Sequence, residues 1–176
     1  MPSHVVTLVG PDRPGLVSAI SDQAAAFGAN WADSVMANFA QHFAGIVHLQ
    51  VPAENCDALM AALRSLESPE LRLVVARSDG GTTEPAVRHL KLDLVGHDRP
   101  GIIRAISSQL ATHGVSIDKL QTHIESGAWS GEQMFHMHAQ LTVPLALESD
   151  TLRSGLESLA NELMVDITFD SGAAAA

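Results

Sequence analysis

A short polar turn occurs twice in this sequence and carries residue types suited to binding a small charged molecule. The turn reads Gly-x-Asp-Arg-Pro-Gly, at residues 10–15 and again at 96–101. Each copy precedes a helical pattern, so it lies at a helix N-terminus, whose free N–H groups and partial positive charge can hold a carboxylate. Its last glycine has no side chain to block that approach, and its aspartate can attract an ammonium group. The turn is a chemical complement of a free amino acid.

The same turn also has a purely structural interpretation. Glycine and proline can simply shape a tight turn, and Asp12 or Asp98 can cap the helix or compensate its dipole. A nucleotide-binding loop is not indicated, because neither Gly-Lys-Ser/Thr nor Gly-x-Gly-x-x-Gly follows the strand. On the residues alone, a ligand site and a shaped turn both stay open.

Histidines provide the second candidate chemistry, since the chain has nine of them. His136 and His138 are two residues apart on a predicted strand and therefore share a face. His123, on the neighbouring predicted strand, is a candidate third metal ligand. The favoured interpretation is a polar sheet face that holds no metal or cofactor. The sequence also has no activated-nucleophile motif, so it indicates a protein that is not an enzyme.

The elements that position these residues form an internal repeat. Residues 8–15 recur at 94–101 with a single change, Pro11 to His97, and the match continues through Gly28 and Gly114. Each copy predicts the order strand, helix, strand, strand, helix, strand. The predicted strands span residues 5–9, 30–38, 42–51 and 71–75, and in the second copy 87–95, 116–125, 133–143 and 164–169.

This order predicts an α+β fold of two tandem ferredoxin-like βαββαβ modules, each an antiparallel sheet with its helices on one face. We expect a first module at residues 1–78, a linker at 79–86, a second module at 87–172 and a disordered tail at 173–176. Because cores of this size are marginal alone, we expect the two sheets to dock side by side.

The composition limits the partners. The formal net charge is -10, which disfavours direct contact with nucleic acid or with an acidic membrane surface. Neither a signal peptide nor an apolar run long enough to span a bilayer is visible, so we expect a cytoplasmic protein. Open sheet edges favour a homo-oligomer.

Taken together, the Asp-Arg-Pro-Gly turn, the aliphatic helix after it and the Gly28-Ala29-Asn30 exit resemble ACT domains. The resemblance implies that an amino acid binds between modules, at the turn after the first strand and the turn after the first helix. Ser116 replaces Asn30 in the second copy, so the two sites need not be equivalent. The implied ligand-binding residues are Asp12, Arg13, Pro14, Gly15 and Asn30 in the first copy and Asp98, Arg99, Pro100, Gly101 and Ser116 in the second.

Two such modules in tandem, with nothing else, resemble the glycine cleavage system transcriptional repressors. This resemblance implies an amino-acid-responsive regulator, with a small ligand such as glycine or serine, that contacts a DNA-binding transcription factor without binding DNA itself. Two alternatives stay open: an interaction module that binds no small molecule, and a metal-assisted enzyme.

Overall fold

The computed structural model describes residues 2–78, 86–126 and 131–170. The chain divides into two units, residues 1–82 and 83–176. Of the predicted linker at 79–86, only Ala86 lies within the described residues, and the predicted tail at 173–176 lies outside them.

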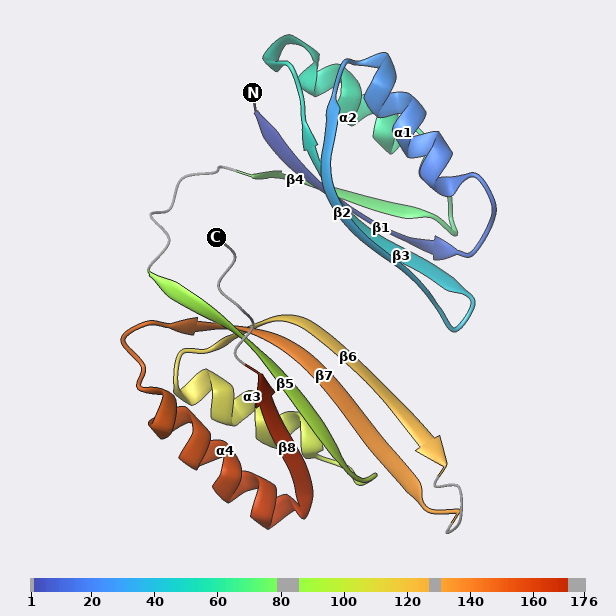
Figure 1. Cartoon of the computed structure of the whole chain (residues 1–176). Coiled ribbons are helices and arrows are strands. Elements are labelled where there is room, and N and C mark those ends of the chain that lie inside the picture. Colours follow the sequence, from blue (N-terminus) through green and yellow to red (C-terminus); the bar gives the residue numbers. More distant parts are fainter. Residues whose placement is uncertain (1, 79–85, 127–130, 171–176) are drawn as a thin grey trace. The chain divides into compact units, whose positions relative to one another are not determined.

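The first module is a four-stranded antiparallel sheet with two helices (Figure 1). Its sheet order is β2-β3-β1-β4. A short 3-10 helix at Ala53–Asn55 precedes the second helix. The elements are β1 (Ser3–Pro11), α1 (Leu16–Ala26), β2 (Asn30–Phe39), β3 (His42–Gln50), α2 (Cys56–Arg64) and β4 (Arg72–Ser78).

The second module repeats this topology, with sheet order β6-β7-β5-β8. Its elements are β5 (Val87–His97), α3 (Ile102–Thr112), β6 (Ser116–Ser126), β7 (Gln133–Pro144), α4 (Ser149–Leu163) and β8 (Val165–Asp170). Both modules therefore have the ferredoxin-like βαββαβ order, and the predicted α+β fold is confirmed.

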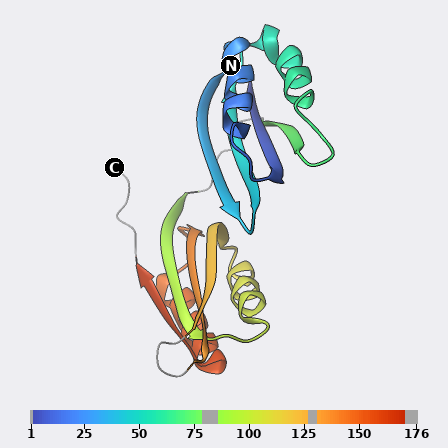
Figure 2. The ribbon, with the colours of Figure 1, turned by 90° about the vertical axis from the view of Figure 1, so that its right-hand side faces the viewer.

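In each module both helices cover the same face of the sheet, which leaves the other face without helices (Figures 1 and 2). The burial of β1 follows from this arrangement: Val6 and Leu8 are buried, while Thr7 and Val9, which point to the other face, are exposed. Each module has its own aliphatic core, formed by its own strands and helices. We call the helix-free side of each sheet its open face.

Glycines and a tight hairpin turn set the ends of the first-module elements. Gly28 has a φ of 66°, the left-handed conformation expected of a glycine that ends a helix. Strands β2 and β3 are joined by Ala40 and Gln41, whose φ values are 49° and 67°. Left-handed residues at both positions are the geometry of a type I′ hairpin turn.

No helix within the three described stretches is long and apolar enough to cross a membrane.

Candidate functional site

The turn between β1 and α1 is open to solvent. Asp12, Arg13, Pro14 and Gly15 are all exposed. Gly15 precedes the helix with a φ of 91°, and a Cβ added there would meet nothing within 4 Å. Glycine is therefore required at this position by its backbone conformation and not by crowding. The space that a side chain would fill is free for a ligand.

The N-terminus of α1 has an uncompensated partial positive charge. Gly15 supplies no side-chain cap, and the first turn of the helix contains no acidic residue. The first N–H groups of a helix have no partner within the helix, and together with the helix dipole they favour a carboxylate. The exposed guanidinium of Arg13 lies two residues before Gly15 and makes no hydrogen bond or ion pair with any described residue.

Asp12 is held in place by the β2–β3 hairpin and is not a helix cap. Its backbone N–H donates to the Gln41 carbonyl at 3.1 Å. Its Oδ2 accepts a hydrogen bond from Asn38 Nδ2 at 2.5 Å. The interpretation of this aspartate as a helix cap is therefore wrong, because the N-cap residue is Gly15 and no side chain caps the helix. The carboxylate keeps a second oxygen that can accept from an ammonium group.

A shallow depression lies at the end of β1 beside this turn. It is lined by Val9, Gly10, Pro11, His42, Glu70 and Arg72. Glu70 and Arg72 give it one carboxylate and one guanidinium, so groups of both charges lie next to the turn. Such a surface suits a small zwitterion better than a simple anion.

The second module repeats the backbone of the turn. Gly101 precedes α3 with a φ of 98° and no neighbour within 4 Å of its Cβ position. The N–H of Asp98 donates to the Gln133 carbonyl at 2.8 Å. The predicted pairs Asp12/Asp98 and Gly15/Gly101 are therefore equivalent in backbone geometry.

The side chains of the two turns differ. The position of Asn38 is taken by Ile124, since each pairs with the phenylalanine that lies opposite the first glycine of its turn. An isoleucine cannot hold Asp98. Arg99 is turned toward the helix α4, where its Nη2 donates to the Glu162 carbonyl at 3.3 Å. This contact satisfies a carbonyl at the helix C-terminus. In the first turn Arg13 is therefore available to a ligand while Asp12 is fixed by a hydrogen bond, whereas in the second turn Arg99 is already bonded.

Asn30 and Ser116 do not lie beside the turns of their own modules. Asn30 pairs with Gln50, which pairs with Ser3 at the start of β1. Asp12 follows the other end of that 9-residue strand, which at ~3.3 Å per residue places the two ends about 26 Å apart. Helix α1 and the turns at its two ends connect these positions, and at this separation one small ligand cannot contact Asn30 and Asp12 of the same module. Ser116 occupies the corresponding place in the second module.

Sequence reasoning singled out His123, His136 and His138 and missed two residues near the candidate sites. Asn38 was missed because its contact with Asp12 depends on cross-strand pairing. Glu125 was also missed, although it lies two residues after His123 and therefore on the same face of β6. Strand alternation was the signal that could have found it.

Comparison with known proteins agrees with the repeat. The ACT domain family model matches residues 4–75 and 88–170. The chain is 24% identical over 163 residues to the glycine cleavage system transcriptional repressors of Escherichia coli (strain K12) and Shigella flexneri, covering 90% of this chain and 84% of each relative. A crystal structure of an unknown protein from Galdieria sulphuraria superposes with a TM-score of 0.86 at 28% identity, covering 97% of this chain and 98% of that one. Since the family model matches both modules over most of their length, this chain belongs to the ACT domain family.

Proposed function

We propose that this chain is an amino-acid-responsive regulatory protein without catalytic activity, which controls transcription of the glycine cleavage system by contact with a DNA-binding protein. The observation that carries the proposal is the duplicated turn, which is open to solvent and ends in a left-handed glycine directly before a helix. The names of the relatives that align along most of the chain support the choice of regulated system.

The first turn is the stronger ligand site. The carboxylate of the amino acid would accept hydrogen bonds from the first N–H groups of α1 and form an ion pair with Arg13. No described residue forms a hydrogen bond or ion pair with the Arg13 guanidinium. The ammonium group would lie against Asp12, whose carboxylate Asn38 positions. Because the space beside Gly15 is open but unlined by apolar side chains, a small side chain such as that of glycine or serine fits the proposal best.

The open face of the first module supports action through protein contact. Val35, Ile46, Thr7 and Val74 lie in one row across the sheet. The three apolar members of this row are 51–65% exposed, and Phe39 on the same sheet is 78% exposed. Exposed apolar residues grouped on one surface are typical of interaction sites. An amino acid can regulate such a contact only if it binds one arrangement of the protein better than another.

Calorimetric titration of the full chain tests ligand binding. We expect glycine or L-serine to bind, and glycinamide and N-acetylglycine, which lack the free carboxylate and the ammonium group, to fail. Gly15→Ala should weaken binding by at least about tenfold, because its methyl group enters the ligand space. Gly131→Ala is the matched control, since it places alanine at a positive φ of 67° with open space around the new Cβ in the second module, and it should retain binding at the first turn. If neither glycine nor L-serine gives a heat of binding, the proposal that this protein responds to an amino acid is refuted.

Affinity purification from native cells, with and without glycine, tests the partner. We expect a DNA-binding protein whose recovery changes with glycine and is lost in the Asp12→Ala variant. Recovery that ignores amino acids and survives both Asp12→Ala and Asp98→Ala would instead establish the ligand-independent interaction module.

A further inference from the structure

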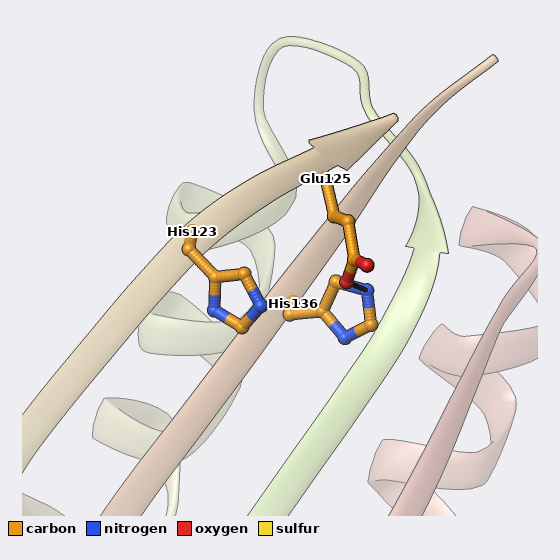
Figure 3. Close-up of side chains that lie close together, drawn as sticks. All are labelled: His123, Glu125 and His136. Atoms are coloured by element: carbon orange, nitrogen blue, oxygen red, sulfur yellow. Dashed lines mark ion pairs between the residues drawn. The ribbon is translucent and has the colours of Figure 1, made fainter. Parts of the chain in front are cut away.

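Two histidines and a glutamate meet on the open face of the second module. His123 and Glu125 alternate on β6, so both point to the same side of the sheet. His136 is the direct cross-strand partner of His123 on β7. Figure 3 shows the Glu125 side chain reaching over the His136 ring, while the His123 ring lies alongside.

The three side chains are close enough to share one ion. The ring centroids of His123 and His136 are 4.6 Å apart, with an angle of 7° between the rings. Nε2 of His136 lies 3.7 Å from a Glu125 carboxylate oxygen. One ligand atom from each residue can be chosen so that all three lie within 4.8 Å of one another. Two nitrogens bound to one tetrahedral zinc are about 3.3 Å apart, as Zn–N bonds of ~2.05 Å require, so small side-chain rotations would complete the site.

The chemistry of this set indicates a divalent transition metal. Imidazole nitrogens are ligands that zinc, copper and nickel prefer, and hard ions such as magnesium and calcium take oxygen ligands instead. Three protein ligands leave one position of a tetrahedral zinc free for water or another group. The side chain of His136 is only 23% exposed, whereas that of Glu125 is 67% exposed, so the ion would lie at the surface with one well-fixed ligand.

A third histidine and an aspartate lie beside the cluster. The His138 ring lies 6.1 Å from that of His123. His138 Nδ1 forms an ion pair with Asp93 on the adjacent strand β5.

The fold itself does not require this cluster, as the first module shows. Strand pairing places Ala37 opposite Ala44 where the second module has His123 opposite His136. The residues that correspond to His123, Glu125, His136 and His138 are Ala37, Phe39, Ala44 and Ile46. The same sheet is therefore stable with apolar or small residues at every ligand position, so the histidines are not there to build it.

We propose that His123, Glu125 and His136 bind one divalent transition-metal ion, with Zn²⁺ as the preferred ion. The site is distinct from the amino-acid site, because it uses none of the turn residues. It gives the second module an activity that the first module does not share.

Titration of the full chain with ZnCl₂, in a preparation without a histidine tag, tests the proposal. We expect one ion per chain by calorimetry, and Co²⁺ substitution should give the visible absorption of a tetrahedral site. Since loss of even an outer-shell partner typically costs 10–100-fold in metal affinity, His136→Ala should weaken binding by at least about tenfold. Glu125→Gln should do the same while conserving shape, which keeps the test valid if His136→Ala impairs folding.

Matched controls come from the same module. His89 and His97 are exposed histidines that each lie near one carboxylate, at 3.7 Å from Asp118 and 3.6 Å from Glu132. His89→Ala and His97→Ala should leave the zinc affinity unchanged. Absence of stoichiometric binding, or binding that His89→Ala weakens as much as Glu125→Gln does, would overturn the proposal.

Discussion

At the scale of single residues, the repeated turn needs its two glycines for different physical reasons. Gly15 and Gly101 have φ values of 91° and 98°, which an L-residue with a Cβ adopts only under strain. The glycines before them have no such conformation but are closely packed. A Cβ on Gly96 would lie 2.4 Å from Val165 Cγ1 and 2.9 Å from its Cβ, whereas one on Gly10 would lie 3.0 Å from the terminal Cδ1 of Leu71.

We predict that Gly96→Ala destabilises the second module by about 1–3 kcal/mol, the usual range for overpacking. The clash involves the Cβ of Val165, the residue paired with Gly96 across β5 and β8. The backbone fixes the position of a Cβ atom, so rotation of the valine side chain cannot relieve this contact. Gly10→Ala should cost the first module less, because the nearest atom is the end of a flexible leucine. Amide hydrogen exchange, followed by NMR in each module, measures both effects. Equal losses would contradict the prediction.

The contact between Asn38 and Asp12 yields a second prediction at this scale. Asn38→Ala removes a charge-assisted hydrogen bond to the Asp12 carboxylate and frees the Asp12 side chain. On the proposed function, glycine should then bind about 2- to 10-fold more weakly, as calorimetry would measure. Ile124→Ala is the control, because Ile124 occupies the same place in the second module and cannot position Asp98. An unchanged affinity in Asn38→Ala would contradict the prediction that the Asn38 contact positions Asp12 for binding.

At the scale of elements, sequence periodicity predicted the strands and their order. The strand predicted at 116–125 is observed as Ser116–Ser126, and that predicted at 133–143 as Gln133–Pro144. Alternation identifies such strands because one face packs on helices and the other does not. The turn of the candidate site was equally readable, because it is local and occurs twice. The contact from Asn38 to Asp12 depends on which strands pair and in what register, which no local pattern contains, whereas Glu125 lies on the same face of β6 as His123 and alternation alone could have found it.

The hairpin between β2 and β3 is an element whose turn chemistry the sequence does not signal. Ala40 and Gln41 both adopt left-handed conformations, at positions where Asn-Gly is the preferred pair. We predict that the double substitution Ala40→Asn and Gln41→Gly stabilises the first module by about 1 kcal/mol. A left-handed conformation costs an ordinary L-residue about 1–2 kcal/mol, and asparagine and glycine tolerate it better. Part of this gain is lost because glycine makes the unfolded chain more flexible.

Urea denaturation measures this gain through Trp31, which packs against the core of the first module. A Trp129→Phe background leaves Trp31 as the only tryptophan, since the chain has two. The control is Ala37→Asn, which introduces asparagine within a strand and should not stabilise. A midpoint unchanged by the hairpin substitutions would argue that the turn carries no strain.

At the scale of the whole molecule, duplication has preserved the backbone while the surfaces have diverged. The turn of the first module has an arginine without a described partner and an aspartate fixed by Asn38. In the second module, Arg99 donates a hydrogen bond to the Glu162 carbonyl at the end of α4. The open face of the first module carries Phe39 and Ile46 where the second has Glu125 and His138. Identical topology therefore supports two different surfaces, and our two proposals place ligand sensing mainly in the first module and metal binding in the second.

The charge of the whole molecule gives the last prediction. With 20 acidic residues against 10 Lys and Arg, the chain repels a phosphate backbone, and non-specific DNA binding depends on cationic contacts that release counterions. In fluorescence anisotropy with a duplex of about 30 base pairs at ~0.15 M salt, we expect no binding up to roughly 10 μM, the range in which cationic proteins already bind non-specifically. On the proposed function, regulation of transcription then requires a partner that contacts DNA. Micromolar binding that weakens steeply as salt is raised would contradict this expectation, and would show that Lys and Arg gather on one surface strongly enough to outweigh the net charge.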